Sequence, residues 1–107
     1  MTKSGQNYKF GDVILVEVPF TDTSETKLRP ALVLFEKYNN VVISGITRNI
    51  DMEGIVLTKE DGVAFNSVIK MNYIFTIYKK NIKTILTHIS LEKKQEVCEL
   101  LKNYLNC

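Results

Sequence analysis

One arginine stands out among the residues that could carry chemistry. Arg29 follows the polar segment 19–28 and directly precedes Pro30, which opens the apolar run ALVL. Proline has no amide proton to give to a strand ladder, so Pro30 is expected at a strand's first residue or on an edge strand. Arg29 would then be a cation at a loop-to-strand junction, suited to grip two phosphate oxygens at once. The ordinary alternative is a solvated arginine paired with Asp22 or Glu25.

The other functional groups exclude several kinds of site. The only histidine is His88, so a ribonuclease mechanism with two histidines from one chain is excluded, as is a histidine-rich metal site. His88 itself is expected to be an ordinary surface or edge residue. Carboxylates are dispersed except for the turn-like pair Glu60-Asp61, which disfavours a two-metal nuclease. Cys98 and Cys107 lack metal-ligand spacing and are expected to be free thiols. We therefore expect no metal and no cofactor.

Length and composition bound the class of protein. The chain has 107 residues, of which 45% are hydrophobic and 24% charged, as in an ordinary globular domain. We expect a flexible N-terminus over residues 1–9 and a single domain over residues 10–107. The formal net charge of +2 neither indicates nor excludes nucleic-acid binding. No apolar run approaches the roughly 18 residues of a membrane span, and no signal peptide is visible, so a cytoplasmic protein without membrane association is expected.

Hydrophobic periodicity predicts a mainly β domain with a C-terminal helix. Strands are predicted at about residues 12–18, 30–36, 41–47, 55–57, 67–77 and 85–89, with a helical turn at 78–82. The first strand is apolar on both faces, which is typical of a strand buried on most sides. Gly45 indicates a bulge or a close backbone approach. Several short strands separated by turns favour a small barrel or sandwich.

The last helix is predicted from its start signal and its apolar stripe. Ser90 is expected to be the N-cap, with Glu92 in the first turn. The stripe expected to pack on the barrel consists of Val97, Cys98, Leu100, Leu101, Tyr104 and Leu105.

The stretch GDVILVEVPFTDTSETKLRPALVL, residues 11–34, resembles the N-terminal half of the MazF/PemK-like toxins. These are the ribonuclease members of type II toxin–antitoxin pairs. Similar features continue in the same order, namely Ile46-Thr47, the run FNSVI at 65–69, Thr76-Ile77 and a lysine-rich turn before the last helix. The resemblance covers about residues 10–105 and implies a small SH3-like barrel of the MazF/PemK/CcdB type.

The resemblance implies a metal-independent, sequence-selective endoribonuclease that cleaves single-stranded RNA by attack of the 2′-OH. The family's catalytic arginine and threonine match Arg29 and Thr47. Arg29 would stabilise the phosphorane or act as the acid, and Thr47 would hold the phosphate or assist proton removal. Without the resemblance, Thr47 is a strand-end hydroxyl bonded to backbone.

Further RNA contacts are carried over, with departures from the family pattern on the late strand. The candidate RNA-binding residues are Ser24, Glu25, Arg48, Ser67, Lys70 and Asn72. One branch of the family has an acidic residue and an arginine on the late strand, where this chain has Asn72 and Lys70, and Phe75 replaces a further arginine. Asn72 cannot act as a general base. The aromatic residues Phe20, Tyr73 and Phe75 either stack on bases or pack in the core or a dimer interface.

The resemblance also implies partners. The family forms homodimers with an RNA groove across the interface, and an antitoxin protein covers that groove. Two alternatives remain open at this stage. One is a toxin of the same fold that acts on a protein such as DNA gyrase, and the other is an inactive RNA-binding or interaction barrel.

Overall fold

The computed structural model describes residues 6–19 and 26–106 and has one antiparallel six-stranded sheet. The strands are β1 (Asp12–Pro19), β2 (Thr26–Lys37), β3 (Asn40–Thr47), β4 (Ile55–Leu57), β5 (Ser67–Tyr78) and β6 (Ile82–His88). Two 3-10 turns, η2 (Lys59–Asp61) and η3 (Lys79–Asn81), and one helix, α1 (Leu91–Leu105), complete the described part of the chain. The turn predicted at 78–82 is thus confirmed as η3, and the last strand begins three residues earlier than predicted.

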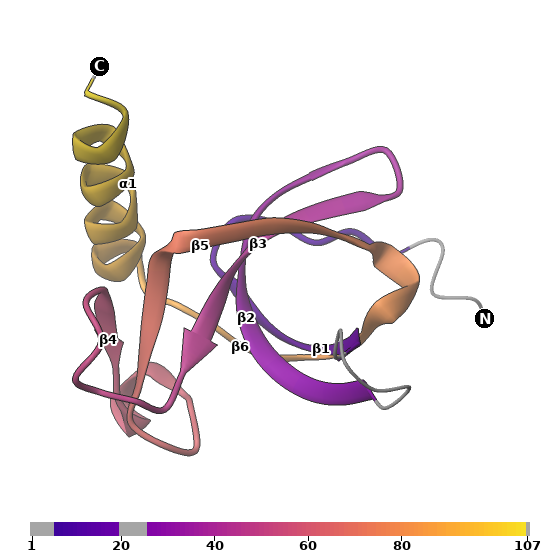
Figure 1. Cartoon of the computed structure of the whole chain (residues 1–107), viewed down its shortest axis with the longest axis horizontal. Coiled ribbons are helices and arrows are strands. Elements are labelled where there is room, and N and C mark those ends of the chain that lie inside the picture. The colour runs from indigo at the N-terminus through magenta and orange to yellow at the C-terminus, as the bar shows by residue number, and fades with distance from the viewer. Residues whose placement is uncertain (1–5, 20–25, 107) are drawn as a thin grey trace.

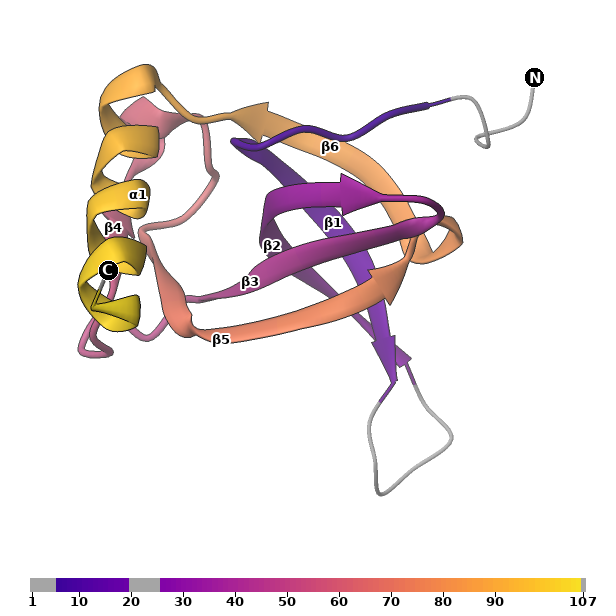
Figure 2. The same cartoon turned by 90° about the horizontal axis from the view of Figure 1, so that it is seen from above.

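The sheet order is β4-β5-β3-β2-β1-β6, and the strands curl strongly toward a barrel (Figure 1). Because β4 and β6 remain as separate edges, the sheet is a half-barrel. Both views place α1 beside β4 (Figure 2). Lys93 of α1 donates from Nζ to the Val56 carbonyl of β4 at 2.7 Å, which covers part of that edge. The predicted mainly β fold with a C-terminal helix is confirmed.

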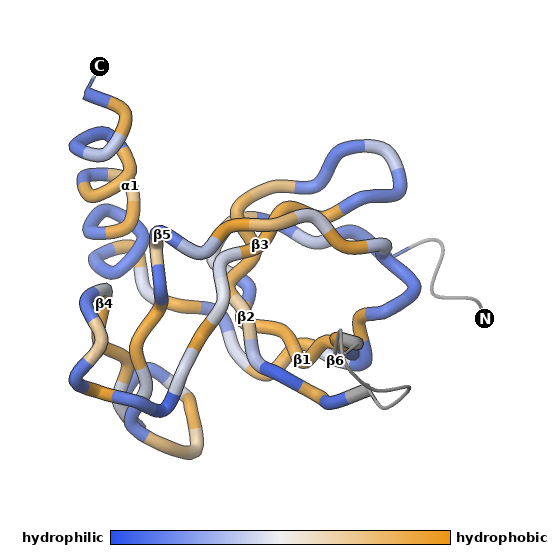
Figure 3. The backbone as a smooth tube through the Cα atoms, in the orientation of Figure 1, coloured by the Kyte–Doolittle hydropathy of each residue, from blue (hydrophilic) through white to orange (hydrophobic). Residues whose placement is uncertain are grey.

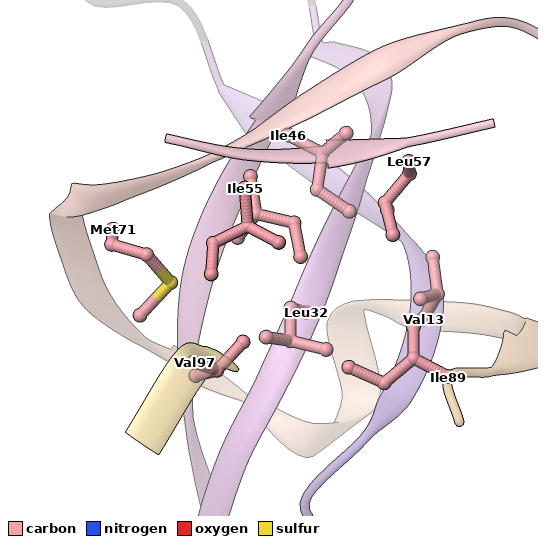
Figure 4. Close-up of a cluster of buried hydrophobic side chains, with 9 residues drawn as sticks. Val13, Leu32, Ile46, Ile55, Leu57, Met71, Ile89 and Val97 are labelled. Atoms are coloured by element: carbon pink, nitrogen blue, oxygen red, sulfur yellow. The ribbon is translucent and has the colours of Figure 1, made fainter. Parts of the chain in front are cut away.

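Both faces of the central strands are buried. Val13 and Leu32 belong to the cluster under α1 and β4, with Ile55, Met71 and Val97 (Figure 4). Their chain neighbours face the other way, into a second cluster made of Tyr8, Ile14, Val16, Ala31, Val33, Val41, Ile43 and Ile82. Successive side chains of a strand point to opposite faces, so two buried faces require the nearly continuous apolar runs seen along the strands in Figure 3.

Pro30 lies inside a strand, which corrects its predicted place at a strand start or edge. β2 begins at Thr26 and pairs with β1 through Arg29 and Pro30, opposite Val16 and Leu15. The pairing of β2 with β3 begins only at Ala31, which lies opposite Gly45. The missing amide proton of Pro30 is tolerated because β2 has β1 alone as its ladder partner here. Arg29 is consequently the fourth residue of β2 and not a loop-junction residue.

The helix begins as predicted but presents a narrower apolar face. The Ser90 side chain accepts the Lys93 backbone N–H at 3.1 Å, which confirms the N-cap. Val97 is buried and Leu100 and Leu101 pack against the first cluster. Cys98, Tyr104 and Leu105 are exposed, contrary to the expected stripe: Cys98 lies to the side of the helix face that carries Val97, Leu100 and Leu101, and Tyr104 and Leu105 lie beyond the part that packs on the core.

Within the segment expected to be a flexible N-terminus, Tyr8 is only 5% exposed and packs in the second cluster. Its backbone N–H donates to Glu36 Oε1 at 2.7 Å, and Lys79 Nζ contacts Glu36 Oε2 at 3.0 Å. Burial raises the pKa of the Glu36 carboxyl, but these two hydrogen bonds outweigh it and hold the pKa below its usual value. Burial, with the charges of Glu36 and Asp12, raises the pKa of Tyr8.

His88 lies on the edge strand β6, as expected for an edge residue, and joins three elements. Its Nδ1 lies 2.8 Å from Asp12 Oδ1 of β1, and its Nε2 lies 3.1 Å from Lys94 Nζ of α1. Since the ammonium of Lys94 can only donate, Nε2 accepts and Nδ1 donates to Asp12. Gly11 makes room for this contact, because a β-carbon there would lie 2.8 Å from His88 Cε1. In the described residues, no helix is long and apolar enough to cross a membrane.

Candidate nucleic-acid interface

Two hollows meet at Arg29 and Thr47. The first, which we call the Lys70 hollow, has a volume of about 370 Å³ and is lined by Val16, Val18, Arg29, Pro30, Ala31, Gly45, Ile46, Thr47, Lys70, Tyr73 and Phe75. The second, the Phe65 hollow, has about 680 Å³ and includes Leu28, Arg48, Asn49, Val63, Phe65, Ser67 and Leu86 in its wall. Arg29, Pro30, Ile46 and Thr47 line both. The predicted catalytic pair therefore lies where the two hollows join.

The sheet itself brings Arg29 and Thr47 together. Ala31 of β2 pairs with Gly45 of β3, and Arg29 and Thr47 each lie two residues from this last pair, at the same end of the β2–β3 ladder. Both belong to paired strands, since Arg29 is opposite Val16 and Thr47 is opposite Val68. Residues two apart on a strand share a face, so Arg29 and Thr47 lie on the face of Ala31 and Gly45. The backbone that carries the pair is thus held by neighbouring strands on both sides of the site.

The Thr47 hydroxyl has a defined hydrogen-bonding role. Its Oγ1 accepts the backbone N–H of Asn49 at 3.1 Å. Because a hydroxyl has one proton and two acceptor positions, this bond leaves the Thr47 O–H available as a donor. The arrangement matches the backbone-bonded alternative for Thr47 and also prepares the hydroxyl to donate to an anion.

Two further cations flank the pair, and each lies over an aromatic ring. Arg48 Cζ is 3.8 Å from the centre of the Phe65 ring, and Lys70 Nζ is 4.9 Å from the centre of the Tyr73 ring. Cation–π contacts of this kind orient a charged side chain without neutralising it. Ser67 Oγ donates to the Phe65 carbonyl at 2.6 Å and fixes the turn that presents this ring. The result is a row of positive groups with aromatic rings between them.

The structure groups most of the predicted site residues. Arg29, Thr47, Arg48, Ser67 and Lys70 all line one or both hollows. Asn72 is exposed on β5 and lines neither of them, so its role in RNA binding stays a prediction. Ser24 and Glu25, together with Phe20, lie outside the described residues.

Phe65 is a component of the site that the sequence interpretation missed. Its ring is half exposed and stacks under Arg48, although it lies in a turn that precedes β5. The available signal was a large aromatic residue in the loop before β5, two residues from the predicted contact Ser67.

The two hollows are electrostatically one-sided. Among the described residues, no carboxylate and no imidazole lines either hollow. Nor does any group of three His, Cys, Asp or Glu side chains that could hold a metal ion occur in residues 6–19 and 26–106. A surface that carries Arg29, Arg48 and Lys70 is suited to bind an anion through hydrogen bonds and charge.

The sequence model of one family matches residues 9–105, and this family is described as the PemK-like, MazF-like toxin of type II toxin–antitoxin systems. The chain belongs to this family. No curated protein matches the chain. The expected family membership is thus confirmed over nearly the whole sequence.

Solved structures of MazF toxins share the fold. The MazE–MazF complex from Deinococcus radiodurans superposes with a TM-score of 0.78 at 16% identity, covering 94% of this chain and 97% of that chain. The Mycobacterium tuberculosis toxin MazF-mt6 gives a TM-score of 0.72 at 17% identity, covering 89% and 96%. A mycobacterial endoribonuclease in complex with its cognate antitoxin gives 0.74 at 13% identity, covering 94% and 95%. These similarities establish the MazF fold for this chain.

Proposed function

We propose that the chain is a metal-independent, sequence-selective endoribonuclease that acts on single-stranded RNA as the toxin of a type II pair. The observation that supports this most directly is that Arg29 of β2 and Thr47 of β3 both line the two hollows. The same two residues match the family's catalytic pair, and a relative of this fold is an endoribonuclease. The cytoplasm, where RNA is abundant, is the proposed place of action.

RNA carries its own nucleophile, the 2′-OH next to each phosphodiester. In the proposed reaction this hydroxyl attacks the neighbouring phosphorus, the bond to the 5′ oxygen of the next nucleotide breaks, and a 2′,3′-cyclic phosphate remains. The Arg29 guanidinium binds the phosphate oxygens that gain charge as the phosphorane forms. The Thr47 O–H donates to one of the same oxygens, because the bond that Oγ1 accepts from the Asn49 N–H leaves the hydroxyl proton available.

Proton transfer in this mechanism relies on few protein groups. The described walls of both hollows contain no carboxylate or imidazole to act as a general base. We therefore assign the proton of the 2′-OH to water or to a phosphate oxygen, and the leaving 5′ oxygen takes a proton from water to become the 5′-OH. The role of Arg29 is charge stabilisation, since a guanidinium keeps its proton in proteins.

The proposal is tested by incubating the purified protein with a long RNA in excess chelator and analysing the ends. We expect cleavage to continue, with a cyclic phosphate on the 5′ fragment and a free 5′-OH on the 3′ fragment. An RNA with 2′-deoxyribose at the mapped cleavage position should resist at that position alone. Loss of cleavage in chelator, or cutting of the deoxy substrate, would contradict the mechanism.

The proposed partners are a second copy of the chain and an antitoxin. Two of the structural relatives are complexes of a toxin with its antitoxin. An acidic, partly apolar antitoxin segment fits the cationic hollows, because carboxylates can occupy the positions of RNA phosphates. We expect such a peptide to compete with RNA. The affinity of the peptide should fall with salt less steeply than that of RNA, since its apolar contacts release no counterions. Simultaneous binding of both ligands would contradict a shared groove.

A further inference from the structure

Tyr73 is an exposed aromatic ring that the fold holds in a fixed place. Its exposed fraction is 55%, yet its Cδ2 atom lies only 2.8 Å from where a β-carbon on Gly45 would stand. The β3–β5 pairing is irregular at this point, between Ser44 and Ile46, so the glycine and the bulge together let the ring lie against β3. The Phe75 ring supports it, with the two ring centres 5.2 Å apart and the planes tilted by 57°.

Tyr73 also separates two hollows of opposite character. On one side is the Lys70 hollow, which contains Arg29 and Lys70. On the other is a third hollow of about 690 Å³, which we call the Tyr78 hollow. It shares Val18, Tyr73 and Phe75 with the Lys70 hollow, and it adds Asn40, Thr76, Tyr78 and Asn81 among its lining residues. No lysine or arginine of the described chain lines the Tyr78 hollow, and its one carboxylate, Glu17, lies 3.7 Å from Lys83 Nζ.

The difference in charge between the hollows on the two sides of Tyr73 indicates the kind of ligand that would fit there. The cationic side attracts phosphate, whereas the far side offers aromatic faces and the neutral donors and acceptors of two asparagines and a threonine. Unpaired nucleotides have the same two parts, a charged backbone and a flat base with hydrogen-bonding edges. Aromatic side chains next to positive groups are a common means of holding unstacked bases.

We propose that Tyr73 and Phe75 form a base-stacking subsite for one unpaired nucleotide adjacent to the scissile phosphate. The base stacks on Tyr73 at the Tyr78 hollow, while Lys70 and Arg29 hold the backbone on the near side. Asn40 and Asn81 contact the edge of the base. The inference rests on the proposed ribonuclease function for the position of the scissile phosphate, and it adds a residue that determines substrate choice. Because purines offer a larger stacking face, a purine is preferred at this position.

The test uses the full chain and a short single-stranded RNA with 2′-O-methyl groups, which binds but cannot be cleaved. Each base in turn is replaced by an abasic unit, and binding is measured by fluorescence anisotropy for the wild type and for Tyr73→Leu. At one position, the abasic unit should weaken wild-type binding about 5- to 100-fold. Tyr73→Leu should weaken binding of the intact RNA by a similar factor and should abolish the effect of that abasic unit.

Two matched variants act as controls. Tyr73→Phe keeps the stacking ring and should bind like the wild type. Tyr38→Leu makes the same change at an exposed tyrosine in the β2–β3 turn that lines none of the three hollows, and it should leave RNA binding unchanged. Thermal unfolding of each variant verifies that it is folded.

The outcomes separate this inference from the proposed function. If the wild type cleaves RNA but no single base contributes to binding, or if Tyr73→Leu leaves the abasic effect intact, the stacking subsite is wrong and the ribonuclease function stands. If Tyr73 and one base are coupled but no RNA is cut, the ribonuclease function is wrong and only the stacking of a base on Tyr73 stands, without a scissile phosphate beside it. If Tyr73→Leu weakens an acidic, partly apolar peptide but not RNA, the ring belongs to a protein-binding surface and the inference is overturned.

Discussion

Gly45 of β3 and Tyr73 of β5 are fitted to each other, because a β-carbon on Gly45 would stand 2.8 Å from the Tyr73 ring. The contact joins the two strands at the irregularity in their pairing and sets the position of a ring that lines two hollows. The glycine has an ordinary backbone conformation here, so space and not a positive φ is what requires it.

The first prediction follows from this contact. Gly45→Ala should move the Tyr73 ring outward, since the ring is half exposed and can turn into solvent. The free energy of unfolding should change by less than about 1 kcal/mol, because alanine in a strand offsets part of the lost ring contact. RNA affinity should fall as far as in Tyr73→Leu, and the double variant should be no weaker than either single variant. Additive losses in the double variant would show that Gly45 acts elsewhere.

A second prediction concerns Arg29. Arg29→Ala should lower the rate of RNA cleavage about 10²- to 10³-fold, because it removes the main stabiliser of charge on the phosphorane. Arg29→Lys should recover only part of the rate, since an ammonium lacks the planar fork that binds two oxygens. The free energy of unfolding should change little because the side chain is exposed. Single-turnover cleavage and urea unfolding measure the two quantities.

Arg48→Ala is the matched control for Arg29, because Arg48 lines only the Phe65 hollow and stacks on its ring. It should weaken RNA binding and reduce the slope of log affinity against log salt by about one, without a large loss of rate for bound RNA. If both arginine variants lose chemistry to the same extent, Arg29 has no special role.

The strands and the helix could be predicted from the sequence, because they depend on the types and spacing of neighbouring residues. The alternating and continuous apolar runs identify the strands, and Ser90 identifies the start of the helix. Gly45 was correctly interpreted, since a lone glycine in an apolar strand has few other uses. Arg29 and Thr47 required the family resemblance, as neither residue type is rare at a strand end.

Contacts between residues far apart in the chain could not be predicted from the sequence. Tyr8 lies in a polar segment, and its burial depends on Glu36, which is 28 residues away along the chain. Pro30 was expected at a strand end because no local signal shows that β2 begins before its pairing with β3 and is paired there with β1 alone. Likewise, the pairing of Arg48 with Phe65 depends on the path of the chain between β3 and β5. Such features arise from packing and not from propensity.

The third prediction separates the Thr47 hydroxyl from its methyl group. Thr47→Val keeps the shape and removes the donor, and it also leaves the Asn49 N–H without its acceptor. We expect cleavage to slow about 10- to 100-fold through the rate of the chemical step, as for loss of one hydrogen bond made in the transition state. Thr47→Ser should retain most activity. Thr84→Val, on the exposed edge strand β6, is the control and should cleave normally.

The last prediction is the acid stability conferred by Glu36, which links the N-terminal segment to β2 and η3. Its pKa is lower in the folded chain than its usual value of 4.5, so the unfolded chain binds more protons under acidic conditions. The stabilisation is therefore complete above about pH 5 and is lost as the pH falls through the folded pKa. Glu36→Gln should cost about 1–2 kcal/mol of unfolding free energy at pH 7, with the difference shrinking below about pH 4.

Urea unfolding of Glu36→Gln and the wild type across this pH range provides the measurement. Glu17→Gln is the control, because Glu17 is 40% exposed and 3.7 Å from Lys83, so its loss should cost less than about 1 kcal/mol. Tyr8 should also become more accessible in Glu36→Gln, since its backbone loses the carboxylate that holds it. A stability difference that persists unchanged down to pH 3 would show that the Glu36 side chain acts through packing and that its charge contributes nothing.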